Sequence, residues 1–264
     1  MARMDASSFS DVWVNKMSAY GDFSLVYDSL TEDVDYKGRT EYLYGLFKSF
    51  GAEPQLLLDL ACGTGSFSLE FANLGVDVIG VDPSEDMLSV AREKAESAGK
   101  DILFLCQSAQ ELELYGTVDG AVCCLDSVNH ITDADELLKA FSKVSLFLEP
   151  DKLFIFDVNT EYKHQTVLGD NTFVFETDNV FCVWQNEYEE ESKSTSVMLD
   201  FFVKDNSGYQ RFSEDFCERA YSREILEKML SMAGFELLAV YDDMQKTAPT
   251  AESERNIYVA RKVK

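Results

Sequence analysis

The stretch LDLACGTG at residues 58–65 restricts the possible folds of this chain more than any other feature. It follows the apolar run QLLLDL (55–60) and precedes SFSLEFANL (66–74), so it predicts a strand, a glycine turn and a helix. Gly63 and Gly65 let the backbone approach a ligand closely, and the helix N-terminus supplies free N–H groups. The G-x-G alone is a weak signal, because Ser68 stands where the dinucleotide fingerprint has its third glycine.

The alternation of strand and helix continues beyond this loop. Further buried strands are predicted for VDVIGV (76–81), DILFLC (101–106), TVDGAVCCL (117–125) and DKLFIFDVN (151–159), with helices at 84–99 and 133–147. Continuous apolar strands between helices favour a parallel sheet that is covered on both faces, with the ligand at the strand carboxyl ends. A helix at 222–234 then precedes two strands, FELLAVYDD and RNIYVARKV, which are expected to pair antiparallel.

Two flanking segments differ from this core. The aromatic-rich segment at 1–50 predicts an N-terminal helical lid, whereas 161–219 lacks a helical period and predicts a small antiparallel β insert. The core itself is assigned to 51–160 and 220–264. The expected fold class is therefore α/β and doubly wound: a seven-stranded, mostly parallel, Rossmann-like sheet with an antiparallel last strand, plus the lid and the insert.

Carboxylates stand at the ends of two predicted strands. Asp59 precedes the glycines, and Asp82 ends the next strand, where it can accept two hydrogen bonds from a ribose diol. A pyrophosphate gains nothing from a carboxylate beside the loop, whereas a positively charged cofactor does. S-adenosylmethionine carries a sulfonium and an α-ammonium, so this pair of acids favours it over a dinucleotide.

At these residues the chain resembles a known family. LLLDLACGTG with VIGVDPSEDML is similar to motifs one and two of the class I S-adenosylmethionine-dependent methyltransferases, over residues 55–160. The strings CLDSVNHI (124–131) and FSLVYDSL (23–30) resemble a subgroup of small bacterial enzymes, some of whose relatives are glycine- or sarcosine-type N-methyltransferases. The resemblance implies S-adenosylmethionine as cofactor and S-adenosylhomocysteine as product.

The resemblance also implies roles for single residues. Gly63 and Gly65 pass under the methionine and ribose, Asp59 lies near the methionine, and Asp82 holds the ribose hydroxyls. Pro83 and Met87 flank the adenine, and the loop 107–109 meets its edge, with a serine where the family commonly has an acid. The implied cofactor-binding set is Tyr20, Asp59, Ala61, Gly63, Gly65, Asp82, Pro83, Met87, Gln107, Ser108, Ala109 and Asp126.

The fourth predicted strand ends at CLDSVNH (124–130), beside the methyl donor. Asp126 and Asn129 are candidates to hold the cofactor's amino group or an acceptor. His130, whose unperturbed pKa is near ~6.5, is a candidate base, with capping of the next turn as the alternative. Tyr27, followed by Tyr20, is the candidate from the lid, and ordinary helix packing is its alternative. The expected catalytic set is thus Tyr27, Asn129 and His130.

Charge and cysteine content exclude several classes of protein. Lys and Arg total 23 against 48 Asp and Glu, a net charge of −25, which disfavours nucleic acids and anionic membranes as partners. The six cysteines form no C-x-x-C pair and only two histidines are present, so neither a disulfide scaffold nor a metal site is expected. Without a signal peptide or an apolar run of ~18 residues, a reduced, cytoplasmic protein is expected, as monomer or homodimer.

The expected function is in-line transfer of a methyl group to an N or O atom of a small molecule. Such a displacement needs alignment and exclusion of water, and no covalent nucleophile. Three alternatives stay open at this point: an RNA or protein methyltransferase, a non-catalytic S-adenosylmethionine-binding regulator, and an NAD-dependent dehydrogenase. Asp59, Ser68 and the final strand pair disfavour the dehydrogenase.

Overall fold

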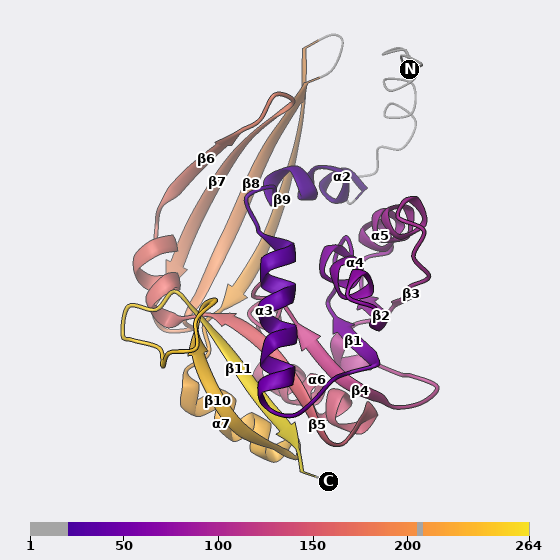
Figure 1. Cartoon of the computed structure of the whole chain (residues 1–264). Coiled ribbons are helices and arrows are strands. Elements are labelled where there is room, and N and C mark those ends of the chain that lie inside the picture. The colour runs from indigo at the N-terminus through magenta and orange to yellow at the C-terminus, as the bar shows by residue number, and fades with distance from the viewer. Residues whose placement is uncertain (1–20, 205–207, 264) are drawn as a thin grey trace.

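Two sheets organise the described part of the chain, residues 21–204 and 208–263 of a computed structural model. The larger sheet has seven strands in the order β10-β11-β5-β4-β1-β2-β3 (Figure 1). Its strands are β1 Leu56–Leu60, β2 Asp77–Asp82, β3 Leu103–Cys106, β4 Val118–Cys123, β5 Leu148–Asn159, β10 Phe235–Asp242 and β11 Arg255–Lys262.

The direction of the strands confirms the doubly wound topology. β1 pairs in parallel with both β2 and β4, while β11 runs antiparallel to β5 and to β10. The chain therefore winds to one side through β2 and β3 and to the other side through β4 and β5. The strand order reverses between β1 and β4, which is where ligands bind in sheets of this kind.

Helices cover both faces of this sheet (Figure 1). One face carries α3, α4 and α5, and the other carries α6 and α7. Their bounds are α3 Tyr36–Ser49, α4 Ser66–Asn73, α5 Glu85–Ser97, α6 Ala134–Phe147 and α7 Arg223–Met232. The side chains of Ser84, Asp133 and Ser222 accept backbone N–H bonds at the starts of α5, α6 and α7, as expected for N-caps.

The smaller sheet is the predicted β insert. Its four antiparallel strands are β6 Thr172–Glu176, β7 Val180–Glu189, β8 Ser194–Lys204 and β9 Tyr209–Arg219. A short helix, η2 Lys163–Leu168, precedes β6, although the sequence pattern of this region suggested strands alone. Thr195 on β8 bonds to His164 of η2, so this helix is tied to the sheet that follows it.

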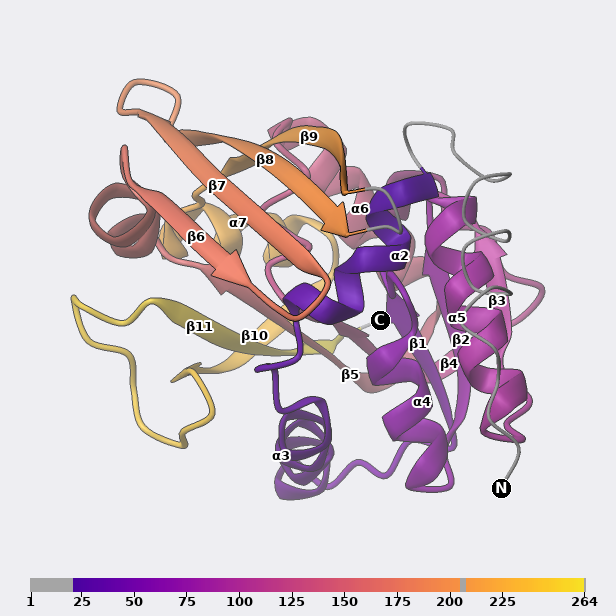
Figure 2. The same ribbon diagram turned by 90° about the horizontal axis from the view of Figure 1, so that it is seen from above.

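The helix α2, Gly21–Leu30, lies between the smaller sheet and the helices α4 and α5 (Figures 1 and 2). The ring of Phe23 lies 5.7 Å from that of Phe201 on β8. The predicted helical segment is interrupted after Leu30, because Asp35 accepts a bond from Gly38 N at 2.9 Å and starts α3. No helix among the described residues is long and apolar enough to span a membrane.

Candidate active site

Left-handed residues shape the loop that follows β1. Ala61, Gly63 and Gly65 have φ angles of 57°, 53° and 73°. A Cβ on Gly65 would lie 2.8 Å from the Cβ of Ala91 on α5, whereas a Cβ on Gly63 would meet no atom within 4 Å. Gly65 is therefore required for packing between the loop and α5, and Gly63 leaves open space beside the loop.

Asp82 ties the ends of β1 and β2 together. Its two carboxylate oxygens accept bonds from Gly63 N and Ser84 N, both at 2.9 Å. The residue is 8% exposed, and burial raises the pKa of its carboxyl even though both hydrogen bonds lower it. The acid thus holds the glycine loop in place, and its carboxylate oxygens keep further lone pairs that can accept hydrogen bonds.

Asp59 is a fully enclosed acid at the end of β1. Burial raises its pKa to about 7, and the hydrogen bond from Ser68 Oγ, at 2.5 Å, opposes this rise. Ser68 lies on α4 at the position of the missing third glycine, and its hydroxyl is what satisfies this carboxylate. The spacing of Asp59 and Ser68 could have predicted this contact, because a serine one turn into the helix can reach back to the strand end.

One small cavity, of about 40 Å³, lies at the glycine loop. It brings together four expected site residues, and its lining is Tyr27, Tyr36, Asp59, Ala61, Cys62, Gly63, Thr64, Ser66, Phe67, Cys124, Leu125 and Ser127. A cavity of this size holds a few water molecules and is too small for a nucleoside as it stands. Tyr27 lines the cavity from α2. A separate hollow of about 230 Å³, between α7 and β10, lies away from these strand ends.

Polar bonds hold α2 against the glycine loop. Asp28 accepts a hydrogen bond from Thr64 Oγ1 at 2.6 Å and an ion-pair bond from Lys94 Nζ at 2.9 Å. Lys94, on α5, also donates to Ser66 Oγ at 2.8 Å. These contacts, together with the burial that raises the pKa of Tyr27, show that α2 is part of the site wall.

The remaining residues of the implied cofactor set have varied surroundings. Pro83 and Met87 flank the start of α5, and Tyr20 lies outside the described residues. Gln107 N donates to Asp82 O at 3.1 Å, which brings the loop after β3 beside the end of β2. Within that loop, the Ser108 hydroxyl bonds to Glu111 at 3.3 Å, and Ala109 packs in the hydrophobic core.

The turn after β4 is braced from β5 and β11. Leu125 and Asp126 both have a φ of 53°, and their N–H groups donate to the Asp157 carboxylate at 2.8 and 2.7 Å. Arg255 of β11 bonds to Asp157 and, at 2.5 Å, to Asp126 Oδ1. Burial opposes ionisation of Asp126, but the Arg255 guanidinium holds the pKa of this acid below its usual value.

Asn129 has a different environment from the one expected. Its side chain is fully buried, and Nδ2 donates to Asn159 O at 3.1 Å and to Arg219 O at 2.9 Å. Its Oδ1 accepts from Asn159 N at 2.9 Å. The amide therefore joins the turn after β4 to β5 and β9, and it is not directed toward an acceptor. Sequence spacing gave no information on these partners.

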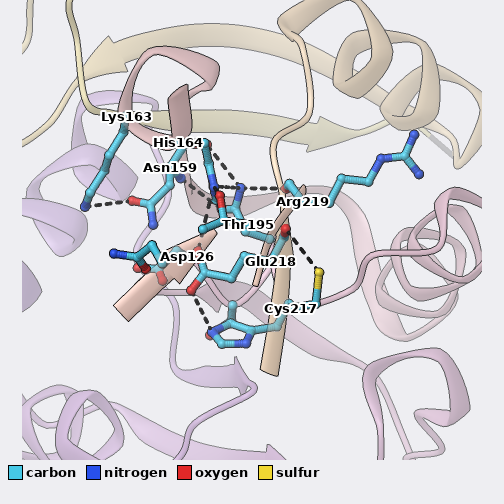
Figure 3. Close-up of polar contacts among 12 residues, drawn as sticks. Asp126, Asn159, Lys163, His164, Thr195, Cys217, Glu218 and Arg219 are labelled. Carbon is cyan, nitrogen blue, oxygen red and sulfur yellow. Dashed lines mark hydrogen bonds and ion pairs between the residues drawn. The ribbon is translucent and has the colours of Figure 1, made fainter. Parts of the chain in front are cut away.

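His130 lies beside the insert with a half-exposed side chain. Its ring packs 4.9 Å from the Phe216 ring, and Nε2 lies 3.6 Å from Glu218 Oε1. The pKa of His130 lies below its usual value, because desolvation of the charged ring outweighs the attraction of Asp126 and Asp82. Oxygen and nitrogen atoms of Asp126, His130 and Glu218 lie within 4.8 Å of one another, a grouping that the sequence did not reveal. Figure 3 shows Asp126 and Glu218 of this grouping.

Comparison with known proteins agrees with this geometry. Residues 57–151 match the family described as "Methyltransferase domain". The chain belongs to the class I S-adenosylmethionine-dependent methyltransferases: it is an enzyme, and its cofactor is S-adenosylmethionine. It is 35% identical over 246 residues to the putative methyltransferase YqeM of Bacillus subtilis strain 168, covering 93% of this chain and 98% of that protein.

Solved structures extend the same result. An S-adenosylmethionine-dependent methyltransferase from Clostridium acetobutylicum is 35% identical, with a TM-score of 0.85, covering 94% of this chain and all of that one. CalS10 from Micromonospora echinaspora, an amino pentose methyltransferase solved with S-adenosylmethionine bound, shares the fold at 18% identity and a TM-score of 0.71, over 90% of this chain and 97% of its own. The expected family, fold, enzyme class and cofactor are confirmed, and the regulator and dehydrogenase alternatives are not supported.

Proposed function

We propose that this enzyme transfers the methyl group in line from S-adenosylmethionine to an N or O atom of a small molecule. The observation that supports this is the attachment of α2 on two sides. Asp28 bonds to Thr64 of the glycine loop, and Phe23 packs on Phe201 of the insert. An enclosed site excludes water from the sulfonium and leaves no open approach for a folded macromolecule.

The proposal divides the chain by role. Residues 51–160 and 220–264 bind the cofactor, 1–50 act as a lid, and 161–219 form the acceptor side. Asp59 faces the methionine and its charges, and Asp82 receives the ribose hydroxyls. The chain would work in the cytoplasm as a monomer or homodimer. The fold shared with CalS10, which acts on an amino pentose, agrees with a small acceptor.

The bound cofactor supplies an electrophilic methyl group. The chain's own residues close the site, accept the proton and support the turn after β4. Tyr27 closes the site from α2. Burial, followed by Tyr36 and the charges of Asp126, Asp28 and Asp82, keeps the pKa of this tyrosine raised. A neutral His130 accepts the acceptor's proton. Asn129, whose amide is fully occupied, supports the turn that carries His130 and does not contact the acceptor.

Label transfer tests this proposal. The purified enzyme is incubated with methyl-labelled S-adenosylmethionine and with separate small-molecule, RNA and protein fractions of a cell extract. We expect label in the small-molecule fraction, with release of S-adenosylhomocysteine, and none with Asp82→Ala, which loses the ribose contact. Label that enters RNA or protein while the small-molecule fraction stays unlabelled would contradict the proposal and favour a macromolecular acceptor.

A further inference from the structure

We propose that Asp126, His130 and Glu218 form a binding site for one divalent transition metal ion, such as Mn²⁺. The site lies where the turn after β4 meets β9 of the insert. The sequence pattern predicted no metal site, because these ligands come from two segments that are far apart in the chain. The inference goes beyond the proposed function and does not depend on it.

The spacing of the three side chains suits the ligands of a single ion. One oxygen or nitrogen atom of each lies within 4.8 Å of the other two. Glu218 Oε1 lies 3.6 Å from His130 Nε2, which is too far for a hydrogen bond. Ligand atoms roughly 2.0–2.2 Å from one metal ion lie about 3.0–3.5 Å from each other. A small inward movement of the side chains would therefore give the spacing of a metal site.

Glu218 supplies a buried carboxylate that the rest of the chain leaves incompletely satisfied. The residue is 4% exposed, and its Oε2 has no hydrogen-bond partner among the described residues. Such an oxygen costs free energy unless a ligand pairs with it. Burial raises the pKa of the Glu218 carboxyl, and the charge of Asp126 adds to the rise. A divalent cation displaces the proton from such a ligand and compensates both carboxylates at once.

Backbone bonds hold the ligands near one another before an ion binds. Asp126 and His130 lie on one tight turn, which is closed by the bond from Asn129 N to Asp126 O at 2.7 Å. Arg219 N donates to Asn129 O at 2.8 Å, so β9 brings Glu218 against that turn. Figure 3 shows Asp126 and Glu218 together at this place. Little of the chain therefore has to be ordered when an ion binds.

Two cationic side chains face the site from other elements. Arg255 of β11 bonds to Oδ1 of Asp126 at 2.5 Å, so Oδ2 is the oxygen that would bind a metal ion. Lys163 of η2 is the second cation near Glu218. With Glu218 ionised, these two cations face three carboxylates, those of Asp126, Asp157 and Glu218. The net charge of the surroundings is therefore negative, and it favours an added cation.

Neither His164 nor Cys217 adds a ligand to this set. His164 Nδ1 lies 2.8 Å from Thr195 Oγ1 and its Nε2 lies 3.4 Å from Asn129 Nδ2, so both ring nitrogens have partners. Cys217 precedes Glu218 on β9, so its thiol leaves the opposite face of the strand. The protein ligands are thus two carboxylates and one imidazole. Such a mixed set suits a transition metal, whereas Mg²⁺ and Ca²⁺ prefer oxygen ligands alone.

A bound ion would remove His130 from the methyl transfer. Nε2 is the ring nitrogen that faces Glu218, and an imidazole that binds a metal through Nε2 keeps its proton on Nδ1. It then has no free lone pair for the acceptor's proton. Under the proposed function the metal-loaded protein is therefore the inactive form, and the ion acts as an inhibitor.

Electron paramagnetic resonance of Mn²⁺ tests the site in the full chain, without cofactor or acceptor. Free Mn²⁺ gives a signal that is lost on binding, so a titration counts the ions bound per chain. Mn²⁺ is chosen because thiols, such as those of the exposed Cys106 and Cys217, prefer softer metals. Excess Mg²⁺ is present to occupy the surface carboxylates of this acidic chain. We expect one Mn²⁺ per chain to stay bound, with coupling to an imidazole nitrogen in its pulsed spectrum.

Substitutions of the ligands identify where the ion binds. Glu218→Gln and His130→Gln should each weaken binding by about tenfold or more, and His130→Gln should also abolish the nitrogen coupling. Asp215→Asn, which changes an exposed acid on the same strand, should leave both unchanged. The His130 side chain is 43% exposed, so its variant should fold even if the Glu218 variant does not.

Three results would overturn the inference. They are complete displacement of Mn²⁺ by excess Mg²⁺, bound Mn²⁺ without nitrogen coupling in the wild type, and coupling that persists in His130→Gln. Because neither cofactor nor acceptor is present, these results are independent of the label-transfer experiment that tests the proposed function.

Discussion

Single residues at the glycine loop have separate tasks that their spacing does not distinguish. Gly65 is closely packed against Ala91, while Gly63 borders open space. Asp82 accepts hydrogen bonds from the backbone N–H groups of two different residues, whereas the hydrogen bonds that lower the pKa of Asp59 come from Ser68 alone. An acid with so few partners in a buried place keeps its proton near neutral pH, and a cationic ligand is what would ionise it.

Cofactor affinity should therefore depend on pH through Asp59. Its pKa is about 7 in the unliganded protein, so the carboxylate needed by the cationic cofactor forms above that value. We expect affinity to fall, by up to about tenfold per pH unit, as pH drops below this pKa. Calorimetry over a pH series measures it. Asp59→Asn should bind weakly with no such dependence, and a wild-type affinity that is flat across the range would exclude the role.

The same acid should limit the stability of the unliganded protein. A folded-state pKa raised above the unfolded value means that stability is complete below the unfolded pKa and is lost as pH rises toward about 7. Asp59→Asn removes that loss. We expect the variant to melt at a higher temperature than the wild type at pH values above the folded-state pKa, with a difference that shrinks in acid. Calorimetric melting in the absence of cofactor measures whether the melting temperature of the variant lies above or below that of the wild type.

The alanine variants of the two loop glycines should differ in stability. Gly63→Ala adds left-handed strain of about 1–2 kcal/mol but no clash, so it should fold and lose cofactor affinity. Gly65→Ala adds the same strain and places a Cβ 2.8 Å from Ala91 and 3.1 Å from Phe104, so it should be the less stable variant. Urea unfolding and calorimetric binding compare them. Equal stabilities would show that α5 yields to the extra carbon.

At the scale of elements, we expect α2 to be the part of the wall that moves when the cofactor enters. The cavity behind it has room for only a few water molecules, and α2 contacts both the core and the insert. Its polar bonds to the core are partly exposed to solvent. They hold α2 in position, but breaking them costs little free energy. The remaining wall consists of strand ends and the glycine loop, which are tied to the sheet.

Removing Asp28 should speed cofactor exchange. Asp28→Ala deletes the bonds to Thr64 and Lys94, so α2 should separate from the loop more often. We expect faster association and dissociation of the cofactor in stopped-flow fluorescence, with a stability loss below about 1 kcal/mol because the pair is partly exposed. Glu32→Ala, an exposed acid just after α2, serves as the control. Exchange rates equal to the wild type would mean that α2 does not limit entry.

For the whole molecule, long-range polar contacts join the site to the last strand. Arg255 of β11 bonds to Asp157 at the end of β5 and to Asp126 after β4. Asn129 in turn connects the same turn to β5 and β9. Three regions far apart in sequence thus determine where the residues of the turn after β4 lie.

Loss of the Arg255 guanidinium should destabilise the entire fold. Arg255→Met leaves two buried carboxylates without their cation, which should cost about 3–5 kcal/mol near neutral pH. The cost should decrease in acid, where Asp126 can take up a proton. Arg211→Met, which breaks an exposed pair with Asp200, should change stability by less than about 1 kcal/mol. Urea unfolding at two pH values decides, and equal effects of the two substitutions would exclude the proposed difference.

The sequence by itself determined the structural features that depend on residues close together in the chain. Apolar runs, caps such as Ser84 and Asp133, and the glycines between β1 and α4 are local signals, because each follows from the backbone within a few positions. The acids at the strand ends were found the same way, since parallel strands bring their carboxyl ends to one edge. These signals were sufficient for the sheet, the insert and the cofactor class.

Only the tertiary structure decided which side chains are free for chemistry. Asn129 was expected at the acceptor, but its side-chain amide instead donates hydrogen bonds to the carbonyl oxygens of Asn159 and Arg219. Glu218 and Arg255 carry no motif. Arg255 reaches the site because β11 pairs with β5, which is distant in sequence, and β9 is joined to the turn after β4 by the bond from Arg219 N to Asn129 O. A hydrogen bond or an ion pair depends on positions in space that residue spacing does not encode, so these partners become visible only once the chain has folded.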